Sequence, residues 1–166
     1  MANVVITGST RGIGRGLAVE FLKRGHNVVV SSRRQADVDK AVSELAATGP
    51  AKIAGTSCDV TRKTDVQALW DFAVAAFGRV DFWINNAGRA TSRYEVHELP
   101  EEMVHTLVDG NFKGSVFGSQ VAISGFRRQG SGALYNMLGG SFDGRRLTPN
   151  MGVYSATKAA DWLLTK

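Results

Sequence analysis

The sequence predicts a single α/β domain built on a doubly wound parallel sheet, and three observations support this fold class. Short runs rich in Val and Ile alternate with longer amphipathic stretches, and turns of a few residues, often containing glycine, separate them. Residues 28–30 are an uninterrupted run of Val, which is typical of a strand covered on both faces. Strands that alternate with helices through short connections form parallel sheets with right-handed crossovers.

Three pairs of a strand and a helix are expected in the first half of the chain. The β-branched run at 3–7 indicates a strand, and the apolar face around Leu17 and Phe21 predicts a helix over 13–24 that ends at Gly25. The other elements of this half are a strand at 26–31, a polar helix at 37–47, a strand around 51–58, and a helix at 63–77 that Gly78 closes.

Two more strands and a last helix are expected in the second half. Residues 80–85 form the fourth strand, and long helical stretches between 100 and 126 lead to a fifth strand at 133–137. A final helix begins near Tyr154 and still continues at the last residue. A chain of 166 residues with 43% hydrophobic residues can bury the core of one such domain, which therefore spans residues 1–166.

Charge and cysteine content limit the partners and the compartment. The net charge is +5, but the basic residues are scattered and form no long block, so a basic ligand pocket is favoured over a nucleic-acid surface. Cys58 is the single cysteine, which excludes an intrachain disulfide and favours a reducing compartment, and it is expected to be a small buried side chain. Neither a charged leader nor an apolar membrane segment is found, so we expect a cytoplasmic protein. His97 and His105 lack partners, so no metal site is expected.

A glycine-rich turn joins the first expected strand to the first helix. It reads Gly8-Ser9-Thr10-Arg11-Gly12-Ile13-Gly14. Gly8 permits the tight turn, Gly12 lets the backbone approach a pyrophosphate, and Gly14 lets the helix pack close to the strand. Free backbone N–H groups at the start of the helix, where Ser9, Arg11 and Ile13 also lie, would face the anion.

The spacing Gly-x-x-x-Gly-x-Gly after a threonine resembles the short-chain dehydrogenase/reductase family. Further motifs extend the resemblance over nearly the whole chain: Asp59-Val60, Asn85-Asn86-Ala87-Gly88, Asn111 and Tyr154-Ser155-Ala156-Thr157-Lys158. The resemblance implies a Rossmann-type NAD(P)-binding domain that transfers a hydride between a nicotinamide cofactor and a carbonyl or alcohol substrate. It also implies a homo-oligomer, and a C-terminal part of the family domain that this chain lacks.

The cofactor expected from the sequence is NADP(H). The second expected strand ends in Ser31-Ser32-Arg33-Arg34, without the acid that usually binds the ribose of NAD. A guanidinium such as Arg33 can bind the 2′-phosphate of NADP, and the resemblance adds Arg11. Alternatively, Arg33 and Arg34 are solvated loop charges.

The resemblance implies further cofactor contacts beyond the phosphates. It places Asp59 and Val60 at the adenine, although Asp59 could instead cap the following helix. Asn85, Ala87 and Gly88 would leave space for the nicotinamide ribose.

The candidate reacting groups are Tyr154 and Lys158, which lie four residues apart and so share one face of a helix. An ammonium beside a tyrosine hydroxyl lowers its pKa. The resemblance implies that Tyr154 donates a proton to the carbonyl oxygen, that Lys158 holds the ribose, and that Asn111 binds a water of the proton relay. A buried structural amide is the alternative for Asn111.

The serine that would polarise the substrate oxygen is ambiguous. Spacing from Tyr154 favours Ser141, whereas alignment on the fifth strand points to Leu138 or Gly139, neither of which has a hydroxyl. We prefer Ser141, brought into place by a curled loop.

The segments 3–12, 83–88 and 135–141 look like the chlorophyll b reductase branch of the family, which reduces a formyl group on a tetrapyrrole. The alternative to a reductase is a regulatory module on the same fold that binds NADP(H) without turnover.

Overall fold

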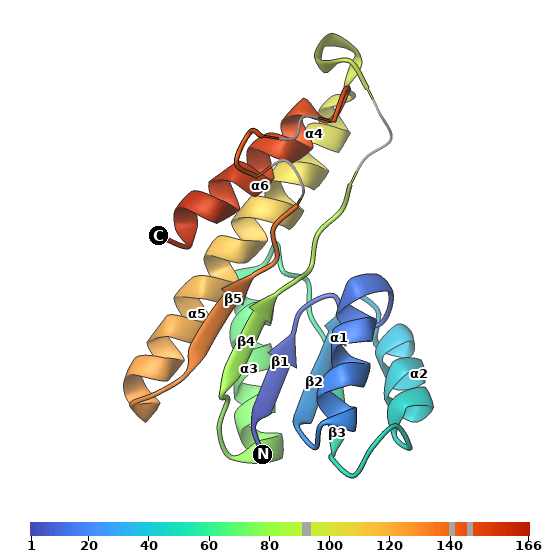
Figure 1. Ribbon diagram of the computed structural model, residues 1–166, viewed down its shortest axis with the longest axis vertical. Helices are drawn as coiled ribbons and strands as arrows, with labels where there is room; N and C mark the ends of the chain where they lie inside the picture. Colours follow the sequence, from blue (N-terminus) through green and yellow to red (C-terminus); the bar gives the residue numbers. More distant parts are fainter. Residues whose placement is uncertain (91–93, 140–141, 146–147) are drawn as a thin grey trace.

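The computed structural model describes residues 1–90, 94–139, 142–145 and 148–166. Within these ranges the centre of the molecule is a five-stranded sheet with the strand order β3-β2-β1-β4-β5 (Figure 1). The strands are β1 (Asn3–Ile6), β2 (Asn27–Ser32), β3 (Ile53–Ser57), β4 (Phe82–Asn85) and β5 (Ala133–Asn136), and all neighbours pair in parallel. The predicted doubly wound α/β domain is therefore confirmed.

Helices connect the strands in the order that the sequence predicts. They are α1 (Gly12–Lys23), α2 (Gln35–Leu45), α3 (Lys63–Phe77), the short 3₁₀ helix η1 (Val96–Glu98), α4 (Glu101–Leu107), the π-helical segment η2 (Val108–Lys113), α5 (Gly114–Gln129) and α6 (Gly152–Leu164). The helical region expected between 100 and 126 is thus divided by a π turn, and α6 begins two residues before Tyr154.

Two hydrophobic cores cover the two faces of the sheet, because successive residues of a strand point to opposite faces. Val5, Val29 and Trp83 pack against α3 and α5 on one face. Val4, Ile6 and Val28 pack against α1 and α2 on the other. In Figure 1 the two helix layers lie on either side of the sheet, and α4 and α6 lie beyond the carboxyl ends of β4 and β5.

Aromatic side chains fill the core between α3, α5 and the sheet. Trp70 lies 6.0 Å from Trp83 and 5.4 Å from Phe126, measured between ring centroids. Gly125 of α5 lies directly against Trp70, where any side chain would collide with the indole. Cys58 is buried at the edge of this core, as its expected role as a small apolar side chain requires.

None of the helices in the described ranges has both the length and the hydrophobicity needed to span a membrane.

Candidate active site

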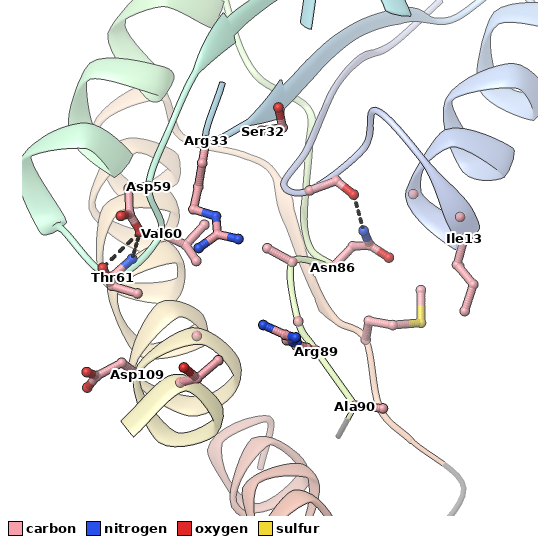
Figure 2. Close-up of a pocket in the computed structure, with 18 of the residues that line it drawn as sticks. Ile13, Ser32, Arg33, Asp59, Val60, Thr61, Asn86, Arg89, Ala90 and Asp109 are labelled. Carbon is pink, nitrogen blue, oxygen red and sulfur yellow. Dashed lines mark hydrogen bonds between the residues drawn. The ribbon is translucent and has the colours of Figure 1, made fainter. Parts of the chain in front are cut away.

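A cleft of about 600 Å³ lies at the carboxyl ends of the strands (Figure 2). It is centred where β1 and β4 are neighbours, and the chain leaves these two strands toward opposite faces of the sheet. Such a topological switch point is where open α/β sheets bind ligands. Each strand contributes the residues just beyond its end, and η2, α4 and α6 form the far wall.

The glycine-rich turn follows β1 and forms one wall of the cleft. Gly8 and Gly12 have φ of +63° and +58°, in the left-handed region that favours glycine. A Cβ on Gly8 would lie 2.8 Å from Cα of Ala87, and one on Gly14 would lie 2.6 Å from the carbonyl oxygen of Gly8. A Cβ on Gly12 would meet nothing within 4 Å. Gly8 and Gly14 therefore permit close packing, while the backbone at Gly12 is open toward the cleft.

Thr7 and Asn86 hold this turn against the segment that follows β4. The Asn86 amide donates hydrogen bonds to the carbonyl oxygens of Thr7 and Gly8, at 2.8 and 3.0 Å. The Thr7 hydroxyl accepts hydrogen bonds from the backbone N–H groups of Asn86 and Ala87, both at 3.0 Å. Neither side chain was among the predicted site residues, although both lie inside the two motifs that carry the family resemblance.

Ser9 and Asn85 do not line the cleft with their side chains, contrary to their predicted place in the cofactor site. The hydroxyl of Ser9, which is fully buried, donates to the carbonyl oxygen of Ile6 at 2.6 Å. The side-chain oxygen of Asn85 accepts from the indole of Trp83 at 2.8 Å, and its amide donates to Asn136. These side chains connect neighbouring segments of the sheet instead.

Two arginines lie at the end of β2, and only one of them faces the cleft. Arg34 donates to both carboxylate oxygens of Asp37 and lowers the pKa of that carboxyl. Arg33 lines the cleft and its side chain points into it (Figure 2). Within the described ranges no acid pairs with Arg33. Arg11, the exposed residue that precedes α1, also lines the cleft.

Asp59 and Val60 follow the end of β3 and line the cleft. The predicted residues Ile13, Ala87 and Gly88 line it as well. One carboxylate oxygen of Asp59 accepts from the backbone N–H and the hydroxyl of Thr61, at 3.0 and 2.8 Å. Helix α3 begins only at Lys63, with Arg62 as its N-cap residue. Asp59 therefore closes a turn ahead of α3, and the alternative that it caps the helix is wrong.

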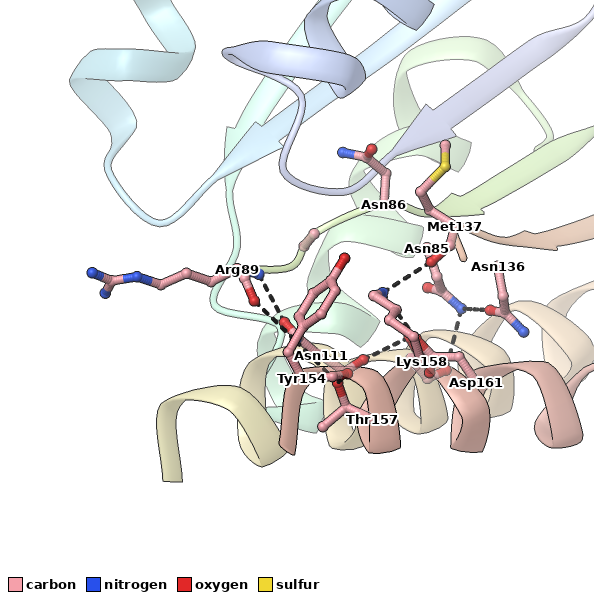
Figure 3. Close-up of polar contacts among 12 residues, drawn as sticks. Asn85, Asn86, Arg89, Asn111, Asn136, Met137, Tyr154, Thr157, Lys158 and Asp161 are labelled. Atoms are coloured by element: carbon pink, nitrogen blue, oxygen red, sulfur yellow. Dashed lines mark hydrogen bonds and ion pairs between the residues drawn. The ribbon is translucent and has the colours of Figure 1, made fainter. Parts of the chain in front are cut away.

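Tyr154 and Lys158 lie one turn apart on α6, and both line the cleft (Figure 3). The Lys158 ammonium donates to the carbonyl oxygen of Met137 at 2.9 Å and to the carboxylate of Asp161 at 3.0 Å. No motif predicts Asp161. Its only signal in the sequence is an acid three residues after a lysine on the same helix.

The pKa of Tyr154 is raised, which is opposite to the direction expected from the neighbouring lysine. Burial is the main cause, and the negative charge of Asp161 adds to it. Burial also raises the pKa of Asp161, against the opposing effect of Lys158. The expected lowering fails because burial of the phenol, and secondly the negative charge of Asp161, act in the opposite direction.

Asn111 is fully buried in η2 and lies behind the wall of the cleft. Its amide oxygen accepts from the backbone N–H of Arg89 at 2.7 Å, and its amide nitrogen donates to the Arg89 carbonyl and the Thr157 hydroxyl, at 3.0 and 3.2 Å. These contacts match the buried structural amide that was the alternative interpretation. They fix the segment after β4 against α6.

The ambiguity of the serine involves Ser141 and the two positions given by alignment on the fifth strand, Leu138 and Gly139. Ser141 lies outside the described residues. Gly139 lies directly beside Tyr154, since a Cβ at this position would be 2.7 Å from the tyrosine hydroxyl. Among the described residues, the position next to the phenol is thus a glycine, which has no hydroxyl group, and Ser141 stays a prediction.

Comparisons with known proteins place the chain in a family. The profile of the short chain dehydrogenase family matches residues 2–166. Chlorophyll(ide) b reductase NOL of Oryza sativa subsp. japonica is 41% identical over 99% of the chain, and probable chlorophyll(ide) b reductase NYC1 of Arabidopsis thaliana is 38% identical over 94% of it. The chain spans 48% and 35% of the lengths of these two relatives.

A solved structure agrees with this placement. The alcohol dehydrogenase of the archaeon Thermococcus sibiricus, complexed with 5-hydroxy-NADP, superposes with a TM-score of 0.89 at 27% identity, covering 99% of this chain and 68% of that one. The profile match over nearly every residue, together with this fold and this cleft, shows that the chain belongs to the short-chain dehydrogenase family.

Proposed function

We propose that this protein is an NADPH-dependent oxidoreductase that reduces a carbonyl group, or oxidises the corresponding alcohol. Its family supports the oxidoreductase class. The observation that carries the finer assignment is Arg33, a cation directed into the cleft at the position where NAD-binding proteins usually have an acid. A guanidinium there suits the 2′-phosphate that distinguishes NADPH from NADH.

The residues of the cleft suit a dinucleotide in other respects. The open backbone at Gly12 leaves room for a pyrophosphate beside the start of α1, where the helix dipole favours an anion. The same cleft is lined by two cations suited to phosphates, Arg11 and Arg33, and by the candidate reacting groups Tyr154 and Lys158. NADPH, when bound, would supply the hydride.

The protein would supply the proton through Tyr154. Its raised pKa keeps the hydroxyl protonated at neutral pH, which suits a donor to the oxygen of a carbonyl substrate. Lys158 has three N–H donors, of which Met137 and Asp161 take two. The third would hold a ribose hydroxyl of the cofactor.

We further propose that the substrate carries a formyl group on a tetrapyrrole. The support is the likeness to two plant chlorophyll(ide) b reductases over nearly the whole chain. A homo-oligomer and a cytoplasmic location stay predictions, and both plant relatives are described as chloroplastic.

A second candidate function is an NADP(H)-binding module without turnover. Gly139 favours it, because this residue, which lies beside the Tyr154 hydroxyl among the described residues, has no side-chain hydroxyl to polarise a substrate.

A fluorescence titration with NADPH and NADH, followed by assays with aldehydes and chlorophyllide b, separates these candidates. Preference for NADPH with turnover supports the reductase, and preference for NADPH without turnover supports the module. Preference for NADH, or binding of neither by a folded protein, would contradict the assignment of the cofactor.

A further inference from the structure

Lys158 and Asp161 form an ion pair inside the protein, with side chains that are only 7% and 1% exposed. The second carboxylate oxygen of Asp161 is buried and accepts no hydrogen bond of ordinary geometry among the described residues, although the nearby Ser115 hydroxyl favours the charged carboxylate. A buried charge with an unfilled acceptor destabilises a fold more than an apolar side chain of similar size would. Packing alone therefore does not account for an acid at this position of α6.

The geometry points to Asp161 as a positioning residue of the active site, which holds the Lys158 ammonium at one place on the cleft wall. The ammonium is fixed from two sides: Met137 follows β5, and Asp161 lies one turn further along α6. As far as the described residues show, one N–H direction of the ammonium is then left for a ligand. The inference rests on the proposed function insofar as that ligand is a hydroxyl group of NADPH.

Asp161 also sets the electrostatic environment of Tyr154. Besides burial, its negative charge is the cause that raises the pKa of the tyrosine. Other described elements contribute the remaining charged residues along the cleft, namely Arg11, Arg33, Asp59, Arg89, Glu102, His105 and Asp109. None of these is a cause of the shift at Tyr154. Removing the Asp161 charge would leave the Lys158 ammonium uncompensated beside the phenol.

Two variants test this role. Asp161→Asn keeps the shape and one acceptor oxygen but removes the charge. Asp161→Leu removes both the charge and the acceptor oxygens. The matched control is Asp71→Asn, the same isosteric change at an exposed residue of α3 whose carboxylate accepts from Gln67. Thermal unfolding followed by circular dichroism verifies that each variant is folded.

The first readout needs no cofactor. Phenolate absorbance is followed as pH rises, and the contribution of Tyr154 is isolated by subtracting the same titration of Tyr154→Phe. In Asp161→Asn the midpoint of Tyr154 is expected to fall by about one pH unit, as for loss of a neighbouring like charge. In Asp71→Asn it stays where it is in the unmodified protein. An unchanged midpoint in folded Asp161→Asn would overturn the inference.

The second readout is the affinity for NADPH. Asp161→Leu is expected to weaken binding roughly tenfold, since one charge-assisted hydrogen bond loses its geometry, and Asp161→Asn less. Unchanged affinity in both folded variants would overturn the positioning role, as would loss of folding in both, because stability would then account for the acid. If the unmodified protein binds no NADPH, the proposed function fails, and the Tyr154 titration still decides the role of Asp161.

Discussion

The Arg34 guanidinium donates hydrogen bonds of 2.8 and 2.6 Å to the two carboxylate oxygens of Asp37. This pair lies on the surface at the start of α2, so Arg34, one of two adjacent arginines, already has a partner. Arg33, its neighbour, is left to face the cleft. Two side chains of the same type, side by side in the sequence, therefore have separate roles, and each serves as a control for the other.

Arg33→Ala should weaken NADPH binding and leave NADH binding unchanged. Loss of a charge-assisted hydrogen bond of about 1.5–3 kcal/mol corresponds to a roughly tenfold to hundredfold higher Kd for NADPH. Arg34→Ala should change neither Kd by more than about twofold, since an exposed ion pair contributes little. Fluorescence titration of both variants measures the effect. An equal loss in Arg34→Ala would show that general positive charge, and not Arg33, attracts the cofactor.

Tyr154→Phe should abolish most turnover while NADPH binding persists. A positioned proton donor contributes about 10²–10⁴-fold to the rate, and phenylalanine keeps the ring but removes the proton. The control is Tyr135→Phe, which removes a hydroxyl from a half-exposed side chain of β5 outside the cleft. Steady-state rates with an aldehyde substrate provide the measurement. Full activity in Tyr154→Phe would mean that another residue donates the proton.

The sheet and its helices could be predicted from the sequence because local patterns and the sheet topology agree. The run of Val in β2, the glycines after α1 and α3, and the glycine-rich turn all signal their structures locally. The π turn of η2 could not be predicted in this way, since its apolar periodicity is nearly that of an α-helix.

The functional side chains were predicted less well because tertiary partners decide where a side chain points. Ser9 and Asn85 lie in the expected motifs, yet buried partners hold their side chains away from the cleft. From the sequence, Asp161 is expected to be exposed like most acids on helices, and only the structure shows that it is buried beside Lys158. The raised pKa of Tyr154 depends on that same burial.

Gly14→Ala and Gly16→Ala should change stability in opposite directions. A Cβ on Gly14 would collide with Asn86 and approach the Gly8 carbonyl oxygen to 2.6 Å, so overpacking should lower the free energy of unfolding by about 1–3 kcal/mol. Gly16 also lies in α1 but has open space around it, so alanine should raise the free energy of unfolding by about 0.5–1 kcal/mol. Urea denaturation measures both. Stabilisation by Gly14→Ala would mean that the turn and α1 are less closely packed than the distances at Gly14 indicate.

Cys58 should make the protein less stable at alkaline pH. Burial above all, with the negative charges of Asp65 and Asp59, raises the pKa of its thiol from 9.0 to about 12. Between these two values the unfolded chain has lost the proton and the folded protein keeps it. The stability that the thiol contributes is therefore fully present below pH 9 and is lost as the pH rises toward 12, with a slope of up to about 1.4 kcal/mol per pH unit.

Cys58→Ala isolates this contribution, because lysines and tyrosines that titrate in the same range are common to both proteins. Urea denaturation between pH 8 and the alkaline limit of folding, roughly the window set by the thiol, should give a shallower decline for Cys58→Ala than for the unmodified protein. The variant should be less stable at neutral pH, since alanine fills less of the buried space, so the two curves should converge as the pH rises. Parallel curves would mean that the thiolate is solvated in the folded protein, and that Cys58 is less enclosed than its position between β3 and α3 indicates.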